Sequence, residues 1–243
     1  MNRRAFLASA GVALSLGVAG RRAASTPDAL VVRVWFSESA ATHDALEDRV
    51  EGYLGGALDE ALDAATVEFA PSTVALPHEG GKASLGRDWP MRVAEGLVGL
   101  GEVDPVGDVN LLVTDGDPRR QPAGYARPHV AAATGGAYIA RMPPVEERPT
   151  VVPYSVPAAA TQLLLHEVGH ALGATHAHGT ARREGDALVA SPMVGSYLWA
   201  SERVREEQLA DGNVCGGAYP SDDGASERRL DLRYADCAAR ALR

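Results

Sequence analysis

One stretch of eleven residues, HEVGHALGATH, constrains this chain more strongly than any other. On a helix, His166 and His170 lie one turn apart on the same face, so both imidazoles can reach one ion at about 2.0–2.1 Å. Gly173 can adopt a positive φ and end the helix, and His176 then returns from a different direction. Three histidines leave a fourth position open for water, as a catalytic zinc site requires. Glu167, at the flank of the ion, can accept a proton from that water.

A methionine follows the histidines in the short segment Ser191-Pro192-Met193. The spacing HExxHxxGxxH with a later methionine turn resembles the signature of the metzincin clan of zinc endopeptidases. The resemblance assigns one catalytic zinc ion to His166, His170 and His176. It makes Glu167 the general base and places Met193 beneath the metal.

The same resemblance implies an α+β fold. Its expected parts are a mixed twisted sheet with a long helix, an active-site helix, the methionine turn, a C-terminal helix and a mostly irregular lower part. It also implies that a protein or peptide substrate pairs as an added strand with an edge of the sheet, near residues 136–140.

The chain departs from several families of the clan. Astacins and serralysins have a tyrosine two residues after the methionine, where this chain has Gly195, and Tyr197 comes two residues later. No cysteine precedes the site, which excludes the cysteine-switch latency of matrixins. Archaemetzincins carry extra cysteines soon after the third histidine, where this chain has Ala177 and His178. The match is therefore to the clan and not to one family.

Other interpretations of the motif stay open. His178 is a rival third ligand, although its spacing from Gly173 fits less well. A gluzincin-type metallohydrolase would instead take a distant glutamate, such as Glu202 or Glu206, as third ligand. A secreted zinc-binding module could keep the site without cutting peptides, and three histidines can also be an ordinary buried polar cluster.

The N-terminus resembles a twin-arginine export signal over residues 1–26, with Arg3-Arg4 followed by an apolar run from Ala8 to Gly20. An uncleaved anchor is the alternative, and cleavage after Gly20 or Ala24 is possible. Residues 27–243 are expected to form a single catalytic domain, secreted and monomeric. No later segment is long and apolar enough to span a bilayer.

The formal net charge of −9 argues against a nucleic-acid partner, which needs basic patches to neutralise phosphates. Lys82 is the only lysine among the 23 basic residues. An acidic, lysine-poor, exported chain is similar to the secreted proteins of salt-adapted archaea, and a bacterial genome of high GC content is the alternative source of this bias.

The two cysteines, Cys215 and Cys237, are predicted to form one disulfide that holds the C-terminal segment. It would close a loop of about 22 residues and contribute roughly 3 kcal/mol. Two further metal ligands are the weaker alternative, because neither cysteine has a partner at ligand spacing. Structural calcium could bind Asp115, Asp117, Asp222 and Asp223, but ordinary solvated turns are the favoured interpretation, because no complete calcium-loop spacing is present.

Hydrophobic periodicity predicts the remaining elements. Strands are expected at 30–36 and 108–114, extended segments at 67–69 and 73–76, and short strands at 123–126 and 136–140. Helices are expected from a cap at Thr42 to Ala65 and over 89–99, 158–172 and 201–209. The helix over 158–172 is apolar on nearly every side, so its histidines should lie inside the protein.

Overall fold

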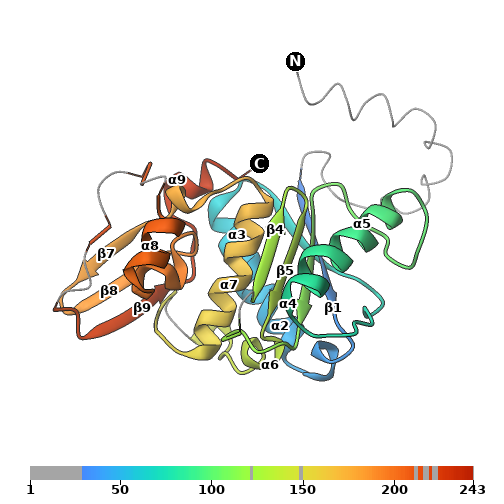
Figure 1. The fold of residues 1–243 in the computed structure, drawn as a ribbon, viewed down its shortest axis with the longest axis horizontal. Helices are drawn as coiled ribbons and strands as arrows, with labels where there is room; N and C mark the ends of the chain where they lie inside the picture. The colour runs from blue at the N-terminus through green and yellow to red at the C-terminus, as the bar shows by residue number, and fades with distance from the viewer. Residues whose placement is uncertain are drawn as a thin grey trace, which may run out of the picture.

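The computed structural model describes residues 29–120, 123–147, 150–210, 213–215, 219–220 and 224–242. The export signal predicted over residues 1–26 lies outside this part of the chain. The described residues form two mixed sheets with helices packed against them, which confirms the α+β class (Figure 1). Among these residues we find no helix with the length and apolar character to cross a membrane.

The larger sheet has five strands in the order β2-β1-β3-β5-β4. Its strands are β1 (Leu30–Phe36), β2 (Ala65–Phe69), β3 (Val109–Thr114), β4 (Gly124–Arg127) and β5 (Val130–Thr134). The first four strands in this order are parallel, and β4 is antiparallel at one edge. The strands predicted at 30–36 and 108–114 are confirmed, and every residue of β3 is buried. Four of its six residues are apolar, as is typical of a parallel strand covered on both faces.

Helices cover both faces of this sheet (Figure 1). On one face, α2 (Leu46–Val50), a π-helical turn (Glu51–Gly55) and α3 (Gly56–Ala61) share a core with the metal-motif helix α7 (Val156–Ala171). On the other face lie α4 (Gly81–Ala83), a second π-helical turn (Ser84–Asp88) and α5 (Trp89–Leu97). Neighbouring residues of β3 point to opposite faces, so Leu111 joins the first core and Leu112 the second.

The helix predicted from Thr42 to Ala65 is shorter at both ends. Thr42 does not cap it, because its hydroxyl donates back to the carbonyl of Ser39 at 2.7 Å and ends a 3-10 turn. The helix begins at Leu46 instead. It stops at Ala61, because Leu62 is already extended and leads into β2.

The strand predicted at 136–140 is wrong, because these residues form the helix α6 (Gly136–Ile139). Gly135 turns the chain with a φ of 106°, and the Asp115 carboxylate accepts the Ala137 amide at 2.7 Å in the first turn. The strand predicted at 123–126 is confirmed as β4, which makes β4 the edge strand. β5 was missed, because its alanine run has little strand propensity of its own and depends on pairing with β3 and β4.

The lower part of the molecule was expected to be mostly irregular, and this is wrong. It contains a four-stranded sheet in the order β6-β9-β8-β7. Its strands are β6 (Val151–Pro153), β7 (Ala181–Glu184), β8 (Ala187–Ala190) and β9 (Glu227–Asp231). These strands have three to five residues each, so no period-two pattern is long enough to predict them. Figure 1 shows α7 between the two sheets.

Two shorter helices complete the described chain. The helix α8 (Glu202–Gln208) confirms the prediction over 201–209, and α9 (Asp236–Ala239) carries Cys237 near the C-terminus. The predicted Cys215–Cys237 disulfide is present. The extended segment predicted at 73–76 is reduced to a single bridge between Val74 and Ser37.

Candidate metal centre

The helix α7 is fixed at its first turn and in its middle, before the residues that carry the histidines. The Ser155 hydroxyl caps the first turn by accepting the Ala158 amide at 3.3 Å, and Pro157 lies where a missing N–H costs nothing. In its middle, the buried Gln162 amide donates to the carbonyls of Ala190 and Asp231 at 2.9 and 3.2 Å. These bonds tie α7 to the second sheet one turn before the first histidine.

Each of the three predicted ligands is held by a carbonyl on the Nδ1 side of its ring. His166 donates to the carbonyl of Pro192 at 2.7 Å, and His170 to that of Ala174 at 2.9 Å. His176 donates to the carbonyl of Gln208 at 2.7 Å. Such bonds set both the tautomer and the ring orientation of a metal-binding histidine.

The opposite ring nitrogens converge. The Nε2 of His166 lies 3.0 Å from that of His170 and 3.3 Å from that of His176. The potential ligand atoms of the three residues all lie within 4.8 Å of one another. Because each Nδ1 carries the proton, each neutral ring points an unshared electron pair at the others. Three such pairs repel one another unless a cation lies between them.

A proton is a poor candidate for that cation. Burial lowers the pKa of His166 well below its ordinary value, and burial lowers the pKa of His170 to about 4. Four-coordinate zinc with bonds of about 2.0–2.1 Å keeps its nitrogen ligands roughly 3.3 Å apart, close to the 3.0 and 3.3 Å that separate the Nε2 of His166 from those of His170 and His176. The three imidazoles therefore fit a metal ion of this kind.

The third histidine arrives as the motif predicts. Gly173 has a φ of 103° and ends the helix, and His176 begins a 3-10 turn over His176–His178.

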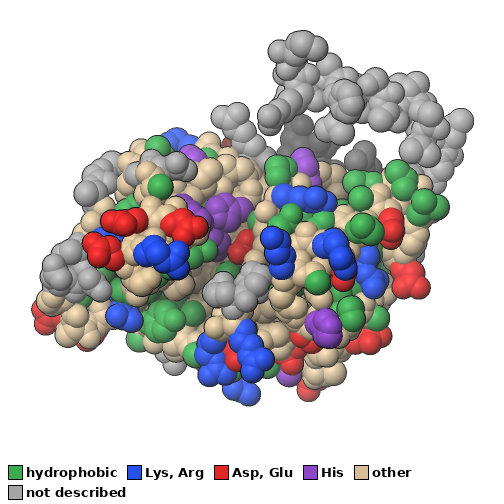
Figure 2. All heavy atoms as spheres, viewed as in Figure 1, with side chains coloured by type: hydrophobic (Ala, Val, Ile, Leu, Met, Phe, Trp, Pro, Cys, Tyr) green, Lys and Arg blue, Asp and Glu red, His purple; other side chains and the backbone are tan. Residues whose placement is uncertain are grey.

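The aromatic ring of Tyr197 lies beside the histidines, with its centroid 5.0 Å from that of His176 and 5.8 Å from that of His166. Burial raises the pKa of Tyr197. In the space-filling view, histidine side chains are visible in a hollow between the two sheet-containing parts (Figure 2).

Met193 is completely buried beneath the motif helix. Its sulfur lies 2.5 Å from the position that a Cβ on Gly169 would take, and the Tyr234 ring lies 3.1 Å from it. A glycine inside the HExxH segment thus allows close packing of the methionine turn. The glycine between the two histidines of the motif is the sequence signal for this packing.

Glu167 is 7 % exposed, and burial raises its pKa to about 8. Its carboxylate lies against Gly124 of the edge strand β4, where any Cβ would overlap it. The free edge of the larger sheet therefore runs past the predicted base. Nothing in the sequence near Gly124 indicates this contact, because 42 residues separate it from His166.

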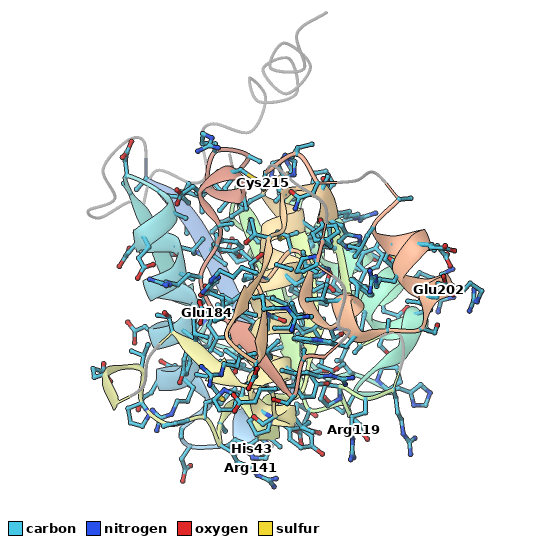
Figure 3. The ribbon with its side chains drawn as sticks, turned by 90° about the vertical axis from the view of Figure 1, so that its left-hand side faces the viewer. His43, Arg119, Arg141, Glu184, Glu202 and Cys215 are labelled. Atoms are coloured by element: carbon cyan, nitrogen blue, oxygen red, sulfur yellow. A yellow bond between two sulfur atoms is a disulfide. The ribbon has the colours of Figure 1, made fainter. Side chains whose placement is uncertain are left out.

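The rival ligands lie elsewhere. The His178 Nδ1 accepts the Thr175 amide at 3.0 Å and so caps the 3-10 turn. Glu202 and Glu206 are exposed on α8, and Figure 3 shows Glu202 pointing outward. Within the described ranges, the three histidines are the one group of three or more residues with metal-ligand spacing.

The aspartates considered for calcium have other partners or lie outside the described residues. Both oxygens of Asp117 accept hydrogen bonds from Arg119, at 2.8 and 2.9 Å, and this lowers the pKa of Asp117 to about 2. Asp115 accepts the Ala137 amide, and Asp222 and Asp223 are not described.

Comparison with known proteins adds no assignment to this geometry. No protein-family model matches the chain, and no curated protein matches it either.

Proposed function

We propose that the chain is a secreted zinc-dependent endopeptidase of metzincin type. One observation carries the proposal: three buried or half-buried imidazoles, each with its Nδ1 held by a carbonyl, direct their Nε2 atoms toward one another, and the buried Glu167 directly follows the first of them on α7. The Cys215–Cys237 disulfide and the export-like N-terminus support secretion.

His166, His170 and His176 would hold the zinc ion. When bound, zinc lowers the pKa of a water molecule and polarises a substrate carbonyl. A cation at this point also favours the ionised form of Glu167, whose burial alone disfavours it. Glu167 then accepts the proton of the attacking water and passes it to the leaving amine.

The edge strand supports a peptide as the substrate. Among the described strands, β4 pairs with β5 alone, so its other side can form main-chain hydrogen bonds with an extended segment. Because Gly124 has no side chain, this edge approaches the Glu167 carboxylate closely. A strand added here would bring its peptide groups next to the base.

The test substitutes the base without touching the ligands. Glu167→Gln should keep one zinc per chain and lose cleavage by about 10²–10⁴-fold, the usual contribution of a general base. His170→Ala should lose both metal and activity. Metal analysis of the purified protein, together with digestion of casein or a peptide library with and without chelator, measures both. Full proteolysis by the Glu167→Gln variant would refute the assignment.

Two alternatives are separated by the same assays. If His176→Ala keeps zinc and activity while Glu202→Gln or Glu206→Gln loses them, a gluzincin-type site is correct. If the wild-type chain binds zinc but cleaves nothing in the library, a non-catalytic metal-binding module is correct.

A further inference from the structure

His176 lies on a different structural element from His166 and His170. His166 and His170 belong to the sixteen-residue helix α7, whose position depends on the core. His176 belongs to a three-residue 3-10 turn beyond Gly173. A turn of this length has little intrinsic stability, so contacts with other segments must hold the ring in place.

Besides the ring contact with Tyr197, hydrogen bonds and close contacts to this turn come from one C-terminal segment, which we call the strap and define by Gln208, Val214, Cys215 and Tyr219. Residues of the strap contact all three main-chain carbonyls of the 3-10 turn. The Tyr219 hydroxyl donates to the carbonyl of His176 at 3.0 Å, and the Val214 amide donates to that of Ala177 at 2.9 Å. The Cys215 sulfur lies 3.0 Å from the carbonyl of His178.

The strap also orients the imidazole ring, because the carbonyl that accepts from the His176 Nδ1 belongs to Gln208. Main chain and side chain of the third ligand are thus both fastened to the same segment. Loss of a hydrogen-bond partner of a metal-binding histidine typically weakens metal affinity by about 10- to 100-fold.

The disulfide connects the strap to the core. Cys237 lies in α9, where Ala238 is buried in the core that also contains α7. Just before α9, the Tyr234 hydroxyl donates to the carbonyl of Leu165 on α7 at 2.6 Å. The Cys237 sulfur itself lies 3.5 Å from the carbonyl of His178. Figure 3 shows Cys215 beside the C-terminal part of the chain.

We infer that the Cys215–Cys237 disulfide, acting through the strap, positions His176 and so sets the metal affinity of the site. The inference rests on the proposed metal site and extends it to residues outside the motif. The simpler role of this disulfide, stabilisation of the whole fold, predicts a lower melting temperature without weaker zinc binding by the folded protein.

The experiment compares the wild-type chain with the double variant Cys215→Ser/Cys237→Ser. Zinc affinity is measured by competition with a chromophoric chelator at a temperature where both proteins are folded, as checked by circular dichroism. We expect a loss of about 10- to 100-fold in affinity. The visible spectrum of the Co²⁺-substituted protein should also change, because the position of one of three nitrogen ligands changes.

A matched control separates positioning from stability. Leu112→Ala creates a cavity in the core on the other face of the larger sheet from α7, and should lower the melting temperature while leaving zinc affinity and the Co²⁺ spectrum unchanged. Tyr219→Phe removes one hydrogen bond and keeps the disulfide, so it should weaken zinc binding by a smaller factor, about 2- to 10-fold.

The outcomes are distinct. Unchanged zinc affinity and an unchanged Co²⁺ spectrum in the folded double variant overturn the inference. A wild-type chain that binds no zinc overturns the metal site itself. A chain that binds zinc with strap-dependent affinity but cleaves no peptide contradicts only the proposed peptidase activity.

Discussion

At the scale of single residues, the site depends on a glycine, Gly124, that leaves room for the carboxylate of Glu167. Gly124 belongs to β4, and the buried Glu167 carboxylate occupies the space that a Cβ there would need. The position of the proposed base is therefore set by the edge strand as well as by α7. A change in β4 can displace the base without touching any ligand.

This predicts the effect of Gly124→Ala. The added methyl group should push the Glu167 carboxylate aside, and a displacement of about 1 Å can lower turnover by roughly 10²-fold. Zinc content should not change, because the three atoms nearest to the added Cβ all belong to Glu167 and none to a ligand. Gly107→Ala is the matched control, since nothing lies within 4 Å of its added Cβ. Wild-type turnover by Gly124→Ala in the peptide assay would contradict this account.

At the scale of elements, α7 is the structural centre of the protein. It is packed between the two sheets, capped by Ser155 and tied by Gln162 to β8 and β9. Its Gly169 lies against Met193 and Tyr234. The helix therefore carries two ligands and the base on a surface that is close-packed on several sides, where small changes in volume are costly.

Two helical glycines should consequently respond to alanine with opposite signs. Gly169→Ala should destabilise the fold by about 1–3 kcal/mol, because the added Cβ overpacks against the Met193 sulfur. Gly56→Ala, in α3 with nothing within 4 Å of the added Cβ, should stabilise it by about 0.5–1 kcal/mol. Urea denaturation of the metal-free proteins measures both, and equal effects of the two substitutions would count against the packing argument.

At the scale of the whole molecule, the metal site connects the core to a distant segment, because the third ligand is bound to Gln208, 32 residues further along the chain. Two ligands come from α7 and the third from the turn that the strap holds. An ion bound by all three links the core to the C-terminal segment. Its binding free energy therefore contributes to the stability of the folded protein.

Removal of the metal should lower the melting temperature. A ligand present at about 1,000 times its Kd stabilises a protein by roughly 4 kcal/mol, which for a chain of this length corresponds to about 8–16 °C. Thermal scans with excess zinc and with excess chelator measure the difference. His176→Ala should lose most of this shift, and a melting temperature independent of chelator would exclude a tightly bound ion.

Elements with a strong local pattern were predicted correctly from the sequence, and elements without one were not. The strand at 30–36 and β3 were predicted because both segments are rich in the β-branched and other apolar residues that strands favour. The convergence of His166, His170 and His176 was predicted from helical spacing and one glycine turn. By contrast, β5 and α6 were missed or misassigned, because an alanine run and a Gly-Ala-Tyr-Ile segment have no decisive local preference.

By itself, the sequence determined everything that short-range geometry controls: the ligand face of α7, the turn at Gly173, the buried strands and the pairing of the only two cysteines. The tertiary structure alone decided which strand borders Glu167, that β6 to β9 form a sheet, and that the strap holds His176. These features depend on contacts between segments separated by tens of residues. Their free energy arises only when the whole chain packs, so no local pattern records it.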